Sequence, residues 1–189
     1  MWRVDDERSP FLPQMLPLVG ARCRNTFAAP DWSLWFSEVG DHKSPGLFAV
    51  LTFGAAGLNL PYIAVARNGE FDVPLGARGQ PVQLESIDFT QRFLIRADDA
   101  RAAVMLVDQG MEQWLLDCDR VSFQITGPVV SGIVKIRQSQ RLQAEELGLL
   151  FRFLDGFAAH VPGLVRTEFS APLEHANAAM AAMRIVSNP

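Results

Sequence analysis

The sequence contains few of the residues that form disulfide frameworks and metal sites. Among its 189 residues are two cysteines, Cys23 and Cys118, and three histidines. Two cysteines form neither a disulfide framework nor a zinc site of the usual spacing. Two free thiols in a reducing compartment are the simpler interpretation, and one disulfide between them is the alternative. The sequence therefore predicts no metal and no cofactor.

Long apolar runs and a surplus of basic residues are also missing. No stretch approaches the roughly 20 apolar residues that a membrane-spanning helix needs, and residues 1–8 (MWRVDDER) are too charged for a signal peptide. Lysine and arginine number 17 against 21 aspartates and glutamates, a net charge of −4, whereas general nucleic-acid binders usually have a basic surplus. We therefore expect a cytoplasmic protein with no membrane span and no nucleic-acid partner.

Recognisable catalytic motifs are missing as well. The chain has no Gly-x-Ser-x-Gly elbow and no phosphate loop with its lysine. The histidines lie far apart, at His42, His160 and His175, with no metal-ligand spacing. Any one of them could serve as a general base in the folded chain, but a place at the end of a predicted helix is sufficient reason for His160. The sequence thus names no catalytic residue and favours a non-enzymatic protein.

The composition that is present is typical of a globular domain. Hydrophobic residues make up 49% of the chain and charged residues 20%, which is enough to bury a core. We predict three parts: an irregular, proline- and aromatic-rich segment at 1–45, a core domain at 46–163, and a C-terminal arm at 164–189. Within the arm, residues 172–189 are weakly helical and are expected to lie on the surface.

Four prolines break any long helix in the first segment; they are Pro10, Pro13, Pro17 and Pro30. An aromatic cluster follows them, formed by Trp32, Trp35 and Phe36. Because each ring can bury a large area, we expect the cluster to cover one edge of the core. A partner-docking patch is the alternative.

Hydrophobic periodicity predicts five strands in the core domain. Short apolar runs and near-alternating stretches favour strands at 46–53, 60–66, 89–97, 121–126 and 129–136. The last two flank Gly127-Pro128 and are expected to form a hairpin. The hairpin-length links predict a largely antiparallel sheet.

Helical spacing predicts two main helices, at about 99–117 and 140–160. Asp99 is the expected N-cap of the first helix. Gly110, inside that helix, is expected to mark a kink or a break into two shorter helices. The predicted fold class is therefore α+β, with the antiparallel sheet packed against these two helices.

Residues 85–99 (ESIDFTQRFLIRADD) and 111–116 (MEQWLL) carry a family resemblance. The pattern resembles a family of uncharacterised bacterial proteins, in which a Glu-Ser…Phe-Arg-Phe-x-Val…Asp-Asp segment precedes a helix that ends Met-x-x-Trp-Leu-Leu. The likeness covers about residues 46–163. Thr90 and Gln91 stand where the family commonly has Asn-Arg, and Ala100 replaces its usual proline. The resemblance implies a shared fold and supplies no activity.

Three arginines are the candidate contact residues. Arg92, Arg96 and Arg101 could gather on the exposed face of the 89–97 strand and at the start of the next helix, as a site for an anion or an acidic partner. A solvated face is the alternative. The adjacent Asp98 and Asp99 are interpreted as a helix cap, because hard cations need more oxygen ligands.

Two functional hypotheses follow. The first is a non-enzymatic α+β domain that acts through protein contacts, as an interaction or accessory module or as a homo-oligomer. The alternative is a binding module for a hydrophobic or anionic small ligand held between the sheet and the 140–160 helix. In that case Phe151, Leu154 and Phe157 would line a cavity instead of filling a core.

Overall fold

One antiparallel sheet organises the protein. The computed structural model describes residues 4–5, 22–29, 31–39, 46–55, 57–68, 78–118, 120–136 and 140–185. Within them, nine strands pair antiparallel in the order β1-β2-β3-β4-β9-β8-β5-β7-β6. Their bounds are β1 Val4–Asp5, β2 Arg22–Ala28, β3 Trp32–Val39, β4 Gly46–Gly54, β5 Leu60–Arg67, β6 Gln80–Val82, β7 Phe93–Ala97, β8 Ser122–Gly127 and β9 Val129–Ile136. The predicted α+β class is confirmed.

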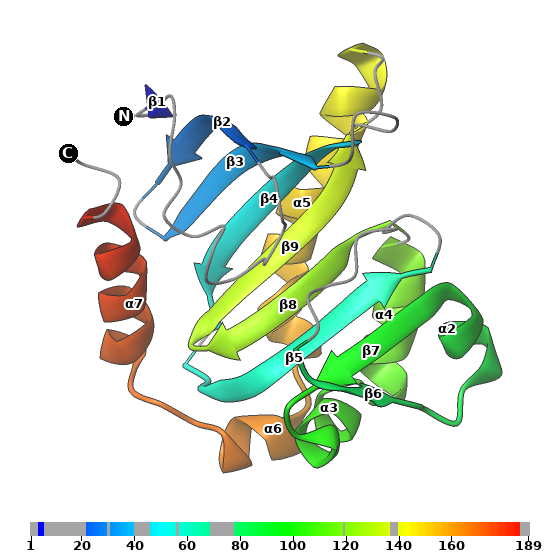
Figure 1. Ribbon diagram of the computed structural model, residues 1–189. Helices are drawn as coiled ribbons and strands as arrows, with labels where there is room; N and C mark the ends of the chain where they lie inside the picture. Colours follow the sequence, from blue (N-terminus) through cyan, green and yellow to red (C-terminus); the bar gives the residue numbers. More distant parts are fainter. Residues whose placement is uncertain are drawn as a thin grey trace.

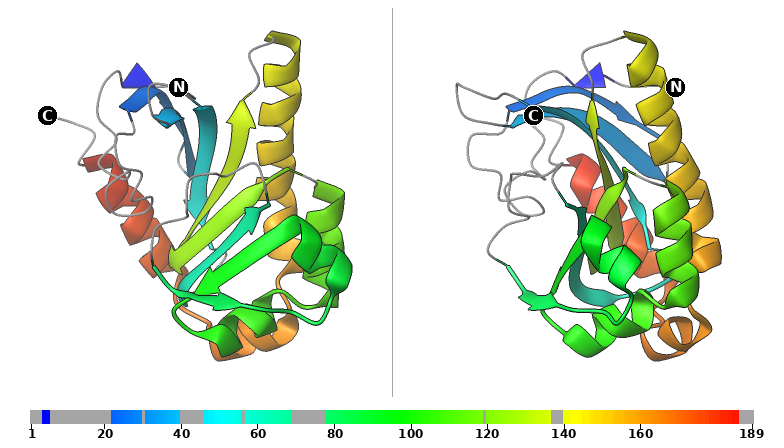
Figure 2. Two further views of the ribbon diagram at one scale, coloured as in Figure 1. Left: turned by 45° about the vertical axis from the view of Figure 1, so that its right-hand side comes forward. Right: turned by 90° about the vertical axis from the view of Figure 1, so that its right-hand side faces the viewer.

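The helices divide between the two sides of this sheet. Their bounds are α2 Ile87–Arg92, α3 Ala100–Leu106, α4 Gln109–Cys118, α5 Gln140–His160, α6 Gly163–Glu168 and α7 Leu173–Ile185. The long helix α5 runs behind the strands in Figure 1. The left view of Figure 2 shows α5 and α7 on opposite sides of β4 and β9. We call the side that α3 to α6 cover the helix face, and the other the second face.

The main core lies between the helix face and α5. Alternate residues of β4, including Leu51 and Phe53, point to it and meet Phe153 and Phe157 of α5. The ring of Phe153 lies 6.0 Å from Phe53 and 5.7 Å from Phe157, centroid to centroid. Gly132 of β9 makes room for this packing, since a Cβ atom there would lie 3.0 Å from Cδ1 of Phe153. Such interdigitated rings leave the core close-packed.

The prediction of an irregular segment at 1–45 is wrong where β2 and β3 form. β3 alternates like any strand with both faces covered: Leu34 points to the main core and Trp35, 1% exposed, points to the second face. Trp32 and Phe36 pack against the core edge, as expected from the sequence. The prolines that suggested irregularity lie outside these two strands.

The stretch predicted as one strand, 89–97, is a helix followed by a strand. Ser86 caps α2 by accepting the N–H of Phe89 at 3.4 Å. Phe89 and Phe93 are four residues apart, and their rings stack with centroids separated by 4.8 Å. That spacing is helical. The strand prediction is therefore wrong for residues 89–92 and right for β7.

The predicted helix at 99–117 is two helices, α3 and α4, whereas the predicted helix at 140–160 is α5. The expected break occurs, but before Gly110, which lies in the first turn of α4. Asp108 starts the second helix, its Oδ1 accepting the N–H of Met111 at 2.9 Å. A second cap, and not the glycine, divides the segment.

The predicted C-terminal arm, residues 164–189, contains α6 and α7. Val165 of α6 is fully buried in the main core and Met180 of α7 is 5% exposed. Much of the remaining surface of α7 is exposed, including Leu173 at 65%. The arm is therefore more helical and better anchored than its sequence indicates. The division into three parts stays a prediction.

Candidate functional site

A row of side chains crosses the second face from the interior to the solvent. Neighbouring strands pair its members in the order Ser33, Thr52, Ser131, Gln124, Ala64, Arg96 and Pro81. The hydroxyl oxygens of Thr52 and Ser131 lie 3.0 Å apart and are buried. The row remains buried as far as Ala64, then becomes accessible at Arg96 and exposed at Pro81. The accessible end of the second face is thus the one formed by β7 and β6.

Arg96 is held rigidly at this end. Its Nε donates to the carbonyl oxygen of Arg78 at 3.2 Å, and its Nη2 donates to that of Gly79 at 2.7 Å. Gly79 has a φ of +74°, and a Cβ atom there would lie 2.8 Å from the carbonyl carbon of Ala97. Only glycine fits this close approach. The guanidinium therefore ties the chain before β6 to β7 and is itself fixed in place.

Arg78 lies beside it with a different set of partners. Its Nε and Nη2 both donate to Oδ2 of Asp98, at 3.1 and 2.8 Å. Its guanidinium carbon lies 4.7 Å from the ring centroid of Tyr62, a cation–π contact. The side chains of Arg78 and Asp98 are 49% and 40% exposed. Arg78 and Arg96 with Asp98 make two positive charges and one negative, a net charge of one positive unit.

The buried side chain of Tyr62 lies beneath this cluster of charges. Burial raises the pKa of its hydroxyl above the ordinary value of 10.0, and Arg78 and Arg96 partly offset the increase. The phenol therefore stays neutral at neutral pH and acts as an aromatic platform. Its backbone carbonyl accepts the N–H of Asp98 at 2.9 Å, which fixes that residue beside the ring.

An exposed leucine lies next to the charges. Leu94 precedes Arg96 by two residues and so points to the same face of β7; it is 56% exposed. We define the β7 patch as Arg78, Leu94, Arg96 and Asp98. The patch combines guanidinium groups with an apolar side chain on a strand surface.

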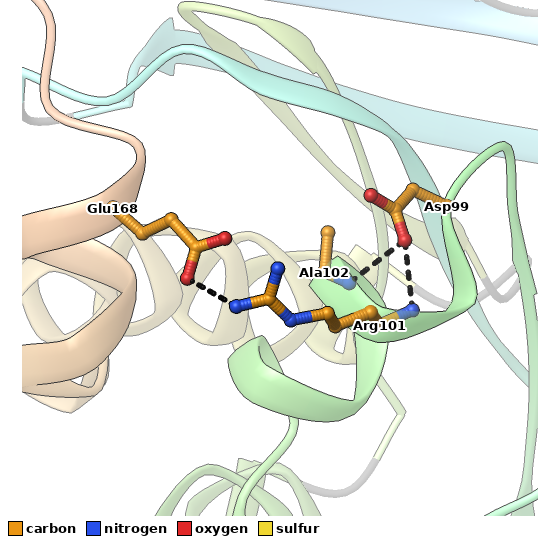
Figure 3. A network of polar contacts seen from close by, with 4 residues as sticks. All are labelled: Asp99, Arg101, Ala102 and Glu168. Carbon is orange, nitrogen blue, oxygen red and sulfur yellow. Dashed lines mark hydrogen bonds and ion pairs between the residues drawn. The ribbon is translucent and has the colours of Figure 1, made fainter.

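The three predicted arginines do not share partners. Arg101 of α3 binds Glu168 of α6, with Nη2 and Oε2 2.9 Å apart (Figure 3). Arg92 is exposed at the end of α2. The structure instead groups Arg96 with Arg78, which lies just before β6 and was not among the predicted arginines. In the sequence, Arg78 could have been found only as an arginine next to a glycine in a loop that leads to a strand. A role for the predicted three in contacts stays a prediction.

Asp99 has the expected structural role. Its Oδ1 accepts the backbone N–H groups of Arg101 and Ala102 at 2.8 and 3.2 Å (Figure 3). This confirms it as the N-cap of α3. The adjacent Asp98 faces Arg78 instead. The acidic pair therefore splits into a cap and an ion-pair partner.

The histidines and cysteines lie away from the patch or outside the described residues. His160 stacks on Trp114 with a centroid separation of 4.6 Å, His175 is exposed on α7, and His42 lies outside the described residues. Cys118 has a free thiol. Burial raises its pKa above the ordinary value of 9.0. Within the described part of the chain, no three His, Cys, Asp or Glu side chains are grouped to hold a metal ion.

Of the three residues proposed to line a ligand cavity, one lies in the core and two pack against it. Phe157 is fully buried, and its ring contacts those of Phe53, Phe123 and Phe153. Phe151 packs edge-on against Trp32 at 5.2 Å, and Leu154 is half-buried against the core. Phe157 is therefore part of the core, and the ligand-binding alternative stays a prediction.

Comparison with known proteins gives a structural likeness. No protein-family model matches the chain, and no curated protein matches it by sequence. The fold is similar to the crystal structure of the mycobacterial trehalose monomycolate transport factor A, TtfA, with a TM-score of 0.57 and 10% identity over 85% of this chain and 89% of that one. This likeness shows the fold alone. Among the described helices, none has the length and apolarity needed to cross a membrane.

Proposed function

We propose that the protein is a non-enzymatic accessory module that acts by binding a protein partner at the β7 patch. The observation that carries the proposal is the half-exposed side chain of Arg78 beside the fixed guanidinium of Arg96 and the 56% exposed Leu94. Arginine and large apolar side chains are typical of protein interfaces. Small-molecule sites are concave and largely apolar, whereas this patch lies on a strand surface.

Two further observations bear on the proposal. Phe157, one of the three residues expected to line a ligand cavity, packs in the aromatic core, which favours the core interpretation at that position. The fold is similar to that of a protein named as the mycobacterial trehalose monomycolate transport factor A; that name refers to a glycolipid and fits the small-ligand alternative loosely. The resemblance to the bacterial family agrees with the proposal and adds no activity to it. The cytoplasmic location stays a prediction.

Site-specific photocrosslinking tests the proposal. A benzophenone amino acid replaces Leu94 in the full chain, and a control replaces Gln113, which is also exposed but lies on α4. In cells that make the protein, we expect one adduct of defined mass from position 94, reduced by Arg78→Ala, and none from position 113. An adduct of twice the chain's mass would identify a second copy as the partner.

Light scattering with size-exclusion chromatography completes the test. A strictly monomeric protein, with equal crosslinking yields at positions 94 and 113, would contradict the proposed function. Circular dichroism of each variant checks that the fold is kept.

A further inference from the structure

We propose that the partner presents an acidic segment, and that one of its carboxylates takes the place of Asp98 on Arg78. The inference rests on the function proposed above and names the chemistry of the partner. Asp98 would then occupy the docking site in the free protein, as an internal competitor. Three features of the β7 patch support this exchange.

The first feature is the geometry of the existing ion pair. Nε and Nη2 of Arg78 both donate to one oxygen, Oδ2 of Asp98. The strongest arginine–carboxylate pairs instead use both carboxylate oxygens in two parallel hydrogen bonds. Asp98 is attached to β7 by its own backbone and does not achieve that arrangement. A carboxylate on a separate chain is free to do so.

The second feature is exposure. The two side chains are 49% and 40% exposed, and ion pairs that solvent reaches to this degree contribute little to stability. Breaking the pair therefore costs little, and Arg78 would keep its contact with the Tyr62 ring, 4.7 Å away. Exchange of one carboxylate for another requires no rearrangement of the sheet.

The third feature is the net charge of the patch. The patch contains two guanidiniums and one carboxylate, so it retains one unit of positive charge while Asp98 is bound to Arg78 and Arg96 is bound to the carbonyl of Gly79. An arginine has five N–H groups, and two of those on Arg96 bind the carbonyls of Arg78 and Gly79. The other three have no partner among the described residues. They are available to a second acidic side chain, beside the apolar surface of Leu94.

The probe is a fluorescent peptide that alternates glutamate with leucine, compared with the same peptide carrying glutamine for glutamate. Anisotropy is measured with the full chain at low salt. We expect saturable binding of the glutamate peptide, weakened by added salt because exposed charges are screened. Asp98→Asn is expected to tighten binding by about two- to fivefold, the effect of removing one exposed competing ion pair. Arg78→Gln is expected to abolish binding of the glutamate peptide, and also the tighter binding caused by Asp98→Asn.

Asp155→Asn is the matched control, because it removes one exposed carboxylate from α5 without touching the patch. Equal effects of Asp98→Asn and Asp155→Asn would overturn the inference, as would equal binding of the glutamine peptide. Equally tight binding of inorganic phosphate or of anionic phosphatidylglycerol vesicles would overturn the acidic segment as the partner. A crosslink at Leu94 that does not respond to Asp98→Asn would leave the proposed function standing and refute the exchange alone.

Discussion

Gly156 of α5 lies so close to Trp114 of α4 that a Cβ atom at position 156 would be 3.0 Å from Cζ2 of the indole. The indole stacks on Phe153 at 5.2 Å and on His160 at 4.6 Å. His160 is itself tied to the helix, its Nδ1 lying 2.9 Å from the carbonyl oxygen of Gly156. The ring therefore has little room to move, and the contact between α4 and α5 depends on the missing side chain at Gly156.

We predict that Gly156→Ala destabilises the protein. Alanine favours a helix over glycine by about 1 kcal/mol, but overpacking a filled site typically costs about 1–3 kcal/mol. We expect the free energy of unfolding, measured by urea denaturation, to fall by about 1 kcal/mol. Gly148→Ala is the control in the same helix. A Cβ atom there would meet Nη1 of Arg152 at 3.6 Å, an ordinary contact, and we expect a gain. Equal gains in both variants would contradict the packing argument.

Truncation of Phe157 should reveal how completely the core under α5 is filled. Its ring is fully buried among Phe53, Phe123 and Phe153, so Phe157→Ala is expected to cost about 3–5 kcal/mol in unfolding free energy. Phe151→Ala, at a half-buried ring, should cost about 1–2 kcal/mol, because part of that ring is already in water. A small loss at Phe157 would indicate a cavity there and revive the ligand-binding alternative.

The sequence predicted the elements with a clear apolar run or period and missed those with two competing patterns. β4 is a short apolar run, β8 alternates apolar and polar residues, and α5 has a long helical stripe. At residues 87–92 the apolar positions fit a strand as well as a short helix, and the Ser86 cap decides for the helix. β3 was missed because the prolines before it suggested irregular structure. Burial of both faces does not by itself hide a strand, since β4 is buried on both faces too.

One residue of the candidate site could be predicted from the sequence. The residues that surround it could not. Arg96 was visible as a cation on the outer face of a strand. Arg78 and Tyr62 join it through long-range pairing of β5, β7 and β6, which local periodicity does not encode. The same limit applies to Arg101, whose partner Glu168 is 67 residues away in sequence.

Loss of the α3 cap provides a local test. Asp99 accepts two first-turn N–H groups, so Asp99→Ala should lower the unfolding free energy by about 1 kcal/mol, the usual value of an N-cap. Asp99→Ser keeps an acceptor and should recover most of the loss, which separates capping from the removal of a charge. The cap assignment fails if the alanine and serine variants melt at the same temperature.

The thiol of Cys118 gives a prediction of pH dependence. Burial, with a smaller contribution from Asp117, raises its pKa above the ordinary value of 9.0, and Arg152 partly offsets this. The folded state therefore binds the proton more tightly than the unfolded state. This contribution to stability is complete below the pKa of the unfolded thiol and is lost as the pH rises through the folded value. We expect unfolding free energy to fall at alkaline pH, and to fall less in Cys118→Ala.

Alkylation kinetics measure the same pKa directly. In a Cys23→Ser background, where Cys118 is the single thiol, the iodoacetamide rate of the native protein should reach its midpoint at a higher pH than in urea, because only the thiolate reacts. Partial burial also slows access, so a low rate at one pH decides nothing. The midpoint of the rate against pH is decisive, since steric shielding lowers the rate at every pH by the same factor and leaves the midpoint unchanged. Equal midpoints in the native and unfolded protein would show that the thiol is not desolvated.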